Sequence, residues 1–521
     1  MDQTVTANRT TWNPDKFRLR RLVERLIDMG EIEIREEPVA LSELSPIIEN
    51  TQKGVLFKKA GPEQHEVVGA VSATRERLAA AFGVPEAKMR EEYMRRMASP
   101  QKTFVVPSNE APVHEVVETG GQVDLTRLPF HVQHEYDGAP YISSGIDFTV
   151  DPVTKRNNVG CRRLMLRGKD KCGFNLTAPS DLRQIYLGCV SRGEKLQASF
   201  TIGAHPLDTM AAANRGAPGQ DEINSIATFR GEPLPLVKCL TNDLYVPADA
   251  EIVLEGYVDE RGYIDNEGPY GEYMGYYGPM HGDPVFHVTA ITRRRDVLHQ
   301  TVKHGIGKKL GWCDGSPMGA VQTEARAMQV LRMAGIDVVD VFVPPGPGVG
   351  AHLRVAIRKR TDGDSRDAIA AILGNSRTTK HVFVVDDDVD VRSDEEIAWV
   401  MASRFQADKD IVVMSNMRFM PMDPSGDQKG NSAKAGFDLT WTFPRPKAVT
   451  ARVPEAPKIG GPARFQTVRQ ALEQGGPTHF AKLMSVLGSR DGREIVLEIE
   501  KLRDEGILER NSDGEYYLVK K

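Results

Sequence analysis

The chain has 521 residues, of which 40% are hydrophobic and 27% are charged, a composition typical of a globular protein with two to four domains. Its formal net charge of −5 argues against a strongly basic nucleic-acid-binding protein. No apolar run approaches the ~18 residues of a membrane span, and the first residues lack a secretory signal. The five cysteines are scattered, without a C-x-x-C pair. We therefore expect a reduced, cytoplasmic protein.

The first 112 residues alternate short helices and strands, which indicates an α/β domain. Apolar residues at helical spacing predict a helix over residues 14–29, with Gly30 as its stop. Ser45 as a cap and Pro46 in the first helical position predict that a short helix begins there. The proline-bearing stretch 107–112 is interpreted as the boundary of this domain.

Strand signals dominate the second predicted domain, residues 113–315. Helical patterns interrupt them at residues 180–191 and 211–228. Many strands with short turns predict an antiparallel barrel or sandwich. The predicted strands are residues 142–150, 158–166, 197–202, 251–258, 285–292 and 297–301.

The third predicted domain, residues 316–450, alternates strands with helices and is expected to be a layered α/β domain. Residues 415–463 are rich in Pro, Gly and Lys and are interpreted as a loop or linker. The extension 464–521 is predicted to form two helices and a hairpin that turns at Asp513-Gly514, which resembles a winged helix. Its many acidic residues argue against DNA binding, so an oligomer contact or an active-site cover is the preferred role.

One loop carries the strongest chemical signal. Residues 266–278 read N-E-G-P-Y-G-E-Y-M-G-Y-Y-G, with Glu267 and Glu272 five residues apart. The proline and glycines between them disfavour a helix, so a shaped loop is expected. Carboxylates beside aromatic walls lose solvation, and two such groups in different surroundings suit proton transfer. A Gly-rich turn with solvated acids is the alternative reading of this stretch alone.

A second segment argues against the alternative that these acids are solvated in a simple turn. Residues 157–166, N-N-V-G-C-R-R-L-M-L, read as a strand on which Arg163 shares a face with Val159, Cys161 and Met165. A guanidinium on a mainly apolar face is costly unless a carboxylate meets it.

Together, N-V-G-x-x-R and E-G-P-Y-G-E about a hundred residues later resemble the UbiD-type family of decarboxylases, which uses prenylated flavin mononucleotide. The resemblance extends to about residue 450. It implies a split β-barrel that binds the flavin, and a dimer or a trimer of dimers. It also implies that a flavin prenyltransferase supplies the cofactor.

The resemblance assigns roles to three residues. Glu272 would be the proton donor that exchanges its proton with the substrate carbon. Arg163 and Glu267 would form the supporting pair, with Arg163 holding the substrate carboxylate. Bidentate pairing would explain why an arginine is needed rather than a lysine.

The resemblance also implies a divalent metal, usually manganese, that anchors the cofactor phosphate, commonly with a nearby potassium. Asn158 and Glu222 match the family's metal-binding Asn and Glu, and Lys380 matches a lysine that contacts the phosphate. The third ligand is usually a histidine, but here the position holds Asp181. An all-oxygen set suits Mn²⁺ or Mg²⁺ better than zinc, and Fe²⁺ is a further possibility. A helix cap at Ser180-Asp181 is the alternative role.

The expected activity is a reversible, non-oxidative decarboxylation of an aromatic, heteroaromatic or α,β-unsaturated acid. A CoA thioester such as an aromatic acyl-CoA is an alternative substrate. Two other classes stay open: a flavin carrier or maturation protein, and a regulator built on an enzyme scaffold. A carrier needs no proton donor, so Arg163, Glu267 and Glu272 argue against it.

Overall fold

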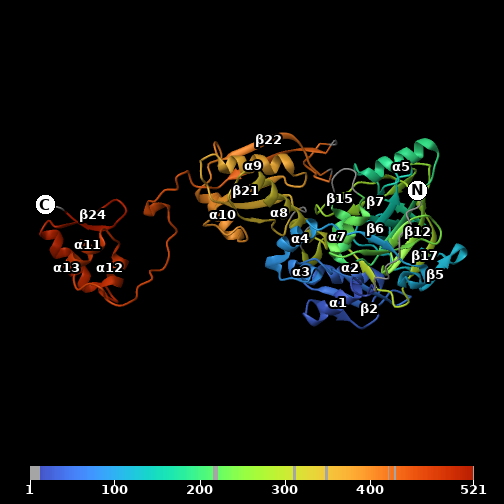
Figure 1. The fold of residues 1–521 in the computed structure, drawn as a ribbon, viewed down its shortest axis with the longest axis horizontal. Helices are drawn as coiled ribbons and strands as arrows, with labels where there is room; N and C mark the ends of the chain where they lie inside the picture. Colours follow the sequence, from blue (N-terminus) through green and yellow to red (C-terminus); the bar gives the residue numbers. More distant parts are fainter. Residues whose placement is uncertain are drawn as a thin grey trace. The chain divides into compact units, whose positions relative to one another are not determined.

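The computed structural model describes residues 12–214, 221–308, 312–346, 350–420, 422–427 and 430–519 (Figure 1). The chain forms two compact units. The larger comprises residues 1–359 and 363–440, and the smaller comprises residues 360–362 and 441–521. The predicted fold class, α/β layers around a central β-barrel, is confirmed.

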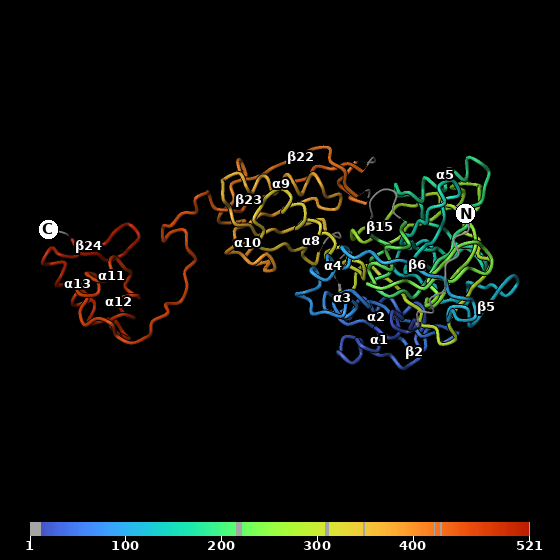
Figure 2. Tube along the Cα trace, in the orientation of Figure 1, coloured from blue at the N-terminus to red at the C-terminus, as the bar shows by residue number. Residues whose placement is uncertain are grey.

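The larger unit opens with a small α/β layer, whose helices α1 and α2 and strand β2 are blue in Figure 2. Its sheet has the order β1-β2-β3-β18, so a late strand returns to the N-terminal segment. The strands are β1 (Ile32–Arg35), β2 (Gly54–Ala60), β3 (His65–Gly69) and β18 (His299–Thr301). The helices are α1 (Leu19–Asp28), α2 (Leu41–Asn50), α3 (Arg75–Phe82) and α4 (Met89–Met97).

Helix α2 begins four residues before the predicted start at Ser45, and Pro46 lies inside it. The Glu43 carboxylate accepts the Ala40 N–H at 2.9 Å and stabilises the earlier start. Leu44 and Ile48 are fully buried. Burial of this face therefore outweighs the hydrogen bond that the proline removes.

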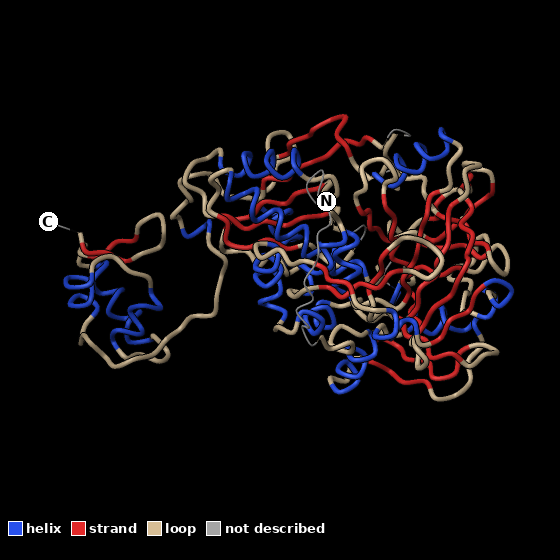
Figure 3. The backbone as a smooth tube through the Cα atoms, turned by 45° about the vertical axis from the view of Figure 1, so that its right-hand side comes forward, coloured by secondary structure: helices blue, strands red, loops and turns tan. Residues whose placement is uncertain are grey.

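The centre of the unit is a closed barrel of six strands, in the order β12-β9-β6-β7-β8-β17 and back to β12. Strands are red in Figure 3. Phenylalanines 174, 200 and 286 meet edge to face or tilted inside it. The strand β8 was not predicted, because four residues, K-C-G-F, carry too little pattern. The strands are β6 (Tyr141–Val150), β7 (Asn157–Leu166), β8 (Lys171–Phe174), β9 (Leu196–Ile202), β12 (Ile252–Val258) and β17 (Val285–Arg293), with β5 (Val116–Thr119) at the edge of β17.

Helices and a small sheet cover the barrel. The helix predicted over residues 211–228 is wrong, because α6 (Pro206–Ala213) and α7 (Ile223–Arg230) are separate, and residues 215–220 lie outside the described residues. The remaining elements are α5 (Asp181–Arg192) and a three-stranded sheet of β4 (Thr103–Val105), β10 (Leu234–Lys238) and β11 (Tyr245–Pro247).

The last part of the larger unit is a five-stranded sheet in the order β19-β20-β21-β23-β22. The loop predicted from residue 415 is wrong at its start, because β22 runs to Arg418 and β23 lies between β21 and β22. In β23, Gly436 leaves room for Ile369 of α9, since an added Cβ would lie 2.1 Å from that side chain. The elements are α8 (Gly315–Met333), β19 (Val338–Phe342), β20 (His352–Ile357), α9 (Asp364–Asn375), β21 (His381–Asp386), α10 (Asp394–Ser403), β22 (Ile411–Arg418) and β23 (Asn431–Asp438).

The smaller unit has the winged-helix-like order of three helices and a hairpin. A bridge between Thr478 and Tyr516 adds a short third strand to the hairpin. The prediction missed the first helix. The elements are α11 (Val468–Gly475), α12 (Phe480–Leu487), α13 (Arg493–Asp504), β24 (Leu508–Arg510) and β25 (Tyr516–Leu518). Across both units, none of the described helices is long and apolar enough to cross a membrane.

Candidate active site

The loop with the two glutamates folds into two short antiparallel ladders. Strand β13 (Asp265–Glu267) pairs with β16 (His281–Asp283), and β14 (Tyr270–Gly271) pairs with β15 (Tyr277–Gly278). Glu267 ends β13, and Glu272 follows β14 at the start of a turn closed by the Gly275 N–H donating to the Glu272 carbonyl at 2.9 Å. The loop therefore places both carboxylates on rigid, hydrogen-bonded backbone.

Arg163 joins the two carboxylates. Its Nε and Nη2 donate to the Oε1 and Oε2 of Glu267 at 2.7 and 2.9 Å, and its Nη1 donates to Glu272 Oε1. The guanidinium also lies 4.4 Å from the ring centre of Tyr270. Leu164 next to it packs in the barrel core, so strand alternation turns Arg163 to the outer face of the barrel. Residues far apart in sequence thus form one cluster.

The charged groups of this cluster are shielded from solvent, because the side chains of Arg163, Glu267 and Glu272 are only 11%, 1% and 10% exposed. Burial opposes the charge of Glu267, but hydrogen bonds from His281 and Arg163 outweigh it and lower its pKa to about 2. Burial likewise opposes the charge of Arg163, whereas its bonds to Glu267 and the charge of Glu272 raise its pKa. Glu267 is therefore a carboxylate at neutral pH.

The segment 133–138 holds the loop from behind. Asp137 Oδ1 accepts the Gly271 N–H at 3.0 Å, and the Tyr270 hydroxyl donates to Gln133 Oε1 at 2.6 Å. The His134 ring lies directly over Gly271, where an added Cβ would come within 2.4 Å of it. His134 itself is fixed by Asp137 at 3.2 Å.

We therefore expect Gly271→Ala to destabilise the protein by about 1–3 kcal/mol, since the methyl group overpacks the contact with His134. Displacing the loop also moves Glu272, so activity should fall with stability. Thermal unfolding and turnover of the variant would be compared with those of Gly121→Ala, because Gly121 has open space around its Cβ position. Equal unfolding temperatures for the two variants would contradict the expectation.

Two of the three residues expected to hold a metal, Asn158 on β7 and Glu222 at the start of α7, are in contact and form a second cluster. Asn158 Nδ2 and the Val159 N–H both donate to Glu222 Oε2, at 2.8 and 2.7 Å. Burial raises the pKa of Glu222, and the nearby charges of Asp181 and Asp147 add to this. Asp181 is the exposed first residue of α5, whose cap is Ser180, with its Oγ accepting the Arg183 N–H at 3.3 Å.

This second cluster has an excess of negative charge. Asp147 is fully buried, and neither of its oxygens has a hydrogen-bond partner among the residues that the structure describes. An ion pair joins it to Arg162 at 3.5 Å. Besides burial, the charges of Asp181 and Asp147 both raise the pKa of Glu222, and that of Arg162 lowers it. Three carboxylates and one arginine leave an excess of negative charge, which a bound cation would offset.

Lys380 lies in the C-terminal sheet region, just before β21. Its ammonium contacts the Asp423 carboxylate and the Ser425 hydroxyl. The same loop brings Met420 to the Tyr273 hydroxyl, at 3.3 Å from sulfur to oxygen. Lys380 is therefore bound to a loop that reaches the Glu272 turn, not to the Asn158 cluster.

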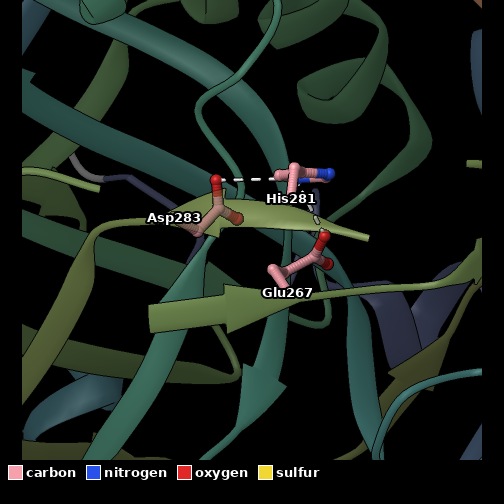
Figure 4. Close-up of side chains that lie close together, drawn as sticks. All are labelled: Glu267, His281 and Asp283. Atoms are coloured by element: carbon pink, nitrogen blue, oxygen red, sulfur yellow. Dashed lines mark ion pairs between the residues drawn. The ribbon is translucent and has the colours of Figure 1, made fainter. Parts of the chain in front are cut away.

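Two residues that the sequence analysis missed complete the first cluster. His281 Nε2 lies 3.1 Å from Glu267 Oε2 and 3.6 Å from Asp283 Oδ1 (Figure 4). The H-G-D spacing on a strand puts both side chains on one face, which was the available signal. Their partner could not be identified, because it depends on the register between β13 and β16.

Family models match most of the larger unit. The 3-octaprenyl-4-hydroxybenzoate carboxy-lyase Rift-related domain matches residues 104–306, and the C-terminal domain of the same family matches residues 316–439. The chain is 32% identical over 431 residues to an anhydromevalonate phosphate decarboxylase of Methanosarcina mazei, covering 81% of this chain and 95% of the relative.

Solved structures agree with this match. The UbiD-class enzyme HmfF from Pelotomaculum thermopropionicum, in complex with FMN, has a TM-score of 0.78 at 30% identity, covering 84% of this chain and 98% of that one. The open form of Sedimentibacter hydroxybenzoicus vanillic acid decarboxylase has a TM-score of 0.73 at 25% identity, covering 85% and 96%. The predicted family and the predicted enzyme class are thus confirmed: the chain belongs to the UbiD family of carboxy-lyases.

Proposed function

We propose that this chain is a prenylated-FMN-dependent decarboxylase that acts reversibly, without net oxidation, on an aromatic, heteroaromatic or α,β-unsaturated acid. The observation that carries the proposal is the guanidinium of Arg163 bridging Glu267 and Glu272. A carrier of flavin needs no such arrangement, because it protonates no carbon.

Each of the three residues has a separate role in the proposed reaction. Arg163 orients the substrate carboxylate through paired hydrogen bonds. Glu272, which accepts a hydrogen bond from Nη1 of Arg163, holds the proton that replaces CO₂ on the substrate carbon. Glu267 stays charged and keeps Arg163 aligned. A prenylated flavin, when bound, supplies the conjugated ring that accepts the electrons left by CO₂.

The residues present fit such a cofactor and its metal. Residues 160–163 of β7 retain exposure, and β8 pairs with this strand only at residues 164–166. We place the planar ring against this stretch, beside Arg163. Asn158, Glu222 and Asp181 would hold Mn²⁺, or Mg²⁺ or Fe²⁺, which would neutralise a phosphate, and K⁺ could join them. The resemblance assigns Lys380 to the phosphate as well, and this role would require Lys380 to give up its contact with Asp423.

The proposed class of substrates can be narrowed to a first candidate. The similarity to anhydromevalonate phosphate decarboxylases supports testing anhydromevalonate phosphate first, beside free aromatic acids and an aromatic acyl-CoA.

The extension 464–521 lies outside both family models, and acids on α13 such as Glu494 and Glu498 argue against a nucleic-acid role.

The test uses the full chain co-expressed with a flavin prenyltransferase. We expect the released cofactor to have the absorption spectrum and mass of prenylated FMN, and we expect at least one acid of the panel to release CO₂. A matched preparation without the prenyltransferase should contain no active cofactor. Bound prenylated FMN without CO₂ release or carboxylation for any acid would favour a carrier instead.

A further inference from the structure

Glu267 lies between two nitrogen bases, Arg163 on one side and His281 on the other. Glu267 and His281 are paired residues across β13 and β16, so the imidazole lies beside the carboxylate by strand register. Figure 4 shows the ion pairs that join His281 to both Asp283 and Glu267.

The contacts of His281 define its protonation. Its Nδ1 lies 2.8 Å from the Pro279 carbonyl oxygen, which can only accept a hydrogen bond. Its Nε2 lies 3.1 Å from Glu267 Oε2 and 3.6 Å from Asp283 Oδ1, which also accept when ionised. An acceptor lies at each ring nitrogen, so the doubly protonated imidazolium satisfies the contacts with Pro279, Glu267 and Asp283. The Asn175 amide nitrogen, 3.4 Å from Nε2, is a further polar neighbour of the ring.

Asp283 stabilises that charge. Its side chain is fully buried, Oδ1 accepts the Leu176 N–H at 3.3 Å, and Oδ2 has no hydrogen-bond partner within the described part of the chain. Burial raises the pKa of Asp283, whereas its contact with His281 lowers it, so the ionised carboxylate depends on a charged neighbour. His281 is the neighbour in reach.

We propose that His281, held charged by Asp283, is a positioning residue that keeps Glu267 ionised and aligned on Arg163, so that Glu272 alone gains and loses the catalytic proton. The inference rests on the proposed function for the role of Glu272. It assigns the asymmetry of the two glutamates to a structural cause: Glu267 contacts two cations, whereas Glu272 contacts Arg163 alone among the described ion pairs.

The charge balance supports the proposal. Contacts with Asp283 and Glu267 raise the pKa of His281 to about 10. This pKa lies above the ordinary value, so the charge is complete at neutral pH and is lost as pH rises through about 10. The other groups facing the cluster are Arg163, Tyr141 beside Glu267, and Tyr263 beside Asp283. Burial raises the pKa of both tyrosines, so they stay neutral in this range.

A metal ion is the competing occupant, because Glu267, His281 and Asp283 each offer a ligand atom within 4.8 Å of the others. Both oxygens of Glu267 already accept hydrogen bonds from Arg163 at 2.7 and 2.9 Å. A divalent cation would have to compete with that guanidinium, whereas a proton on His281 does not.

The first experiment needs no substrate. Imidazole ¹⁵N NMR of the full holoprotein, with the His281 signal assigned by its loss in His281→Gln, should show an imidazolium from pH 6 to pH 9. Asp283→Asn should move the titration to lower pH. A neutral His281 at pH 8 in the wild type would overturn the proposal. A signal that changes on adding EDTA, and returns with Mn²⁺, would assign a metal instead.

The second experiment measures turnover. We expect His281→Gln to lower kcat at least about tenfold with little change in KM, since a charge-assisted hydrogen bond to Glu267 is lost. His281→Lys should recover part of the loss. The matched control is His287→Gln, because His287 pairs with Asp259 at 2.8 Å elsewhere on the barrel. Equal kcat and pH profiles for wild type and His281→Gln would overturn the role. If wild type turns over no acid, the proposed function fails, and the NMR titration still decides the charge of His281.

Discussion

Glu272→Gln is expected to lower kcat by about 10²–10⁴-fold while the flavin stays bound, because an amide cannot give up the proton that replaces CO₂. Glutamine keeps the shape of the side chain and can still accept from Arg163. The loop that positions it depends on backbone contacts, including the Glu272 N–H donating to the Tyr276 carbonyl at 2.9 Å. The loss should therefore be chemical and not structural.

Three measurements separate the proton donor from a structural role. The absorption spectrum should show unchanged cofactor content, the unfolding temperature should stay near that of wild type, and CO₂ release should disappear. The matched control is Glu118→Gln, which alters a carboxylate paired with Arg293 at 3.4 Å on the same barrel and should leave kcat unchanged. Full activity of Glu272→Gln would assign the proton to another group.

The barrel was predictable where long strands alternate. Residues 142–150 and 158–166 carry that pattern, and the structure has strands there within a residue at each end. The strands β8 and β23 were not predictable, because K-C-G-F and N-S-A-K-A-G-F-D contain few β-branched residues. Their neighbours in the sheets, not their own propensity, make them strands.

The residues of the candidate site also fall into a predictable group and a group that the sequence does not reveal. Arg163, Glu267 and Glu272 were predicted through two spaced motifs that resemble those of the UbiD-type family, and the structure brings the three side chains together. His281 and Asp137 act through contacts with residues far from them in sequence, His281 through strand register and Asp137 through the Gly271 N–H at 3.0 Å. A single sequence does not encode such distances in any local pattern, so these supports became visible only in three dimensions.

Arg163 should tolerate substitution least, because one planar group serves two carboxylates. Three of its nitrogens are engaged, two by Glu267 and one by Glu272. Lysine offers a single ammonium, which cannot span both partners in this geometry. We expect Arg163→Lys to lower kcat at least about a hundredfold, since both substrate alignment and the contact with Glu272 are lost.

Arg163→Gln should also destabilise the fold, by about 3–5 kcal/mol, because it leaves buried carboxylates without their cation. The contact of His281 with Glu267 should keep the cost near the lower end of that range. Adding Glu272→Gln to Arg163→Gln should restore part of the stability but none of the activity, since one unpaired charge is removed while the catalytic groups stay absent.

Unfolding temperature and CO₂ release of the two single variants and the double variant would test this, with Arg293→Lys as the control for an arginine paired on the same barrel. Wild-type activity in Arg163→Lys would show that a point charge is sufficient and would contradict the bridging role. A double variant that is less stable than both single variants would show that the arginine and Glu272 do not stabilise each other. In either case, the bridging role of Arg163 would be lost, and the asymmetry between Glu267 and Glu272 would rest on the contact of His281 with Glu267.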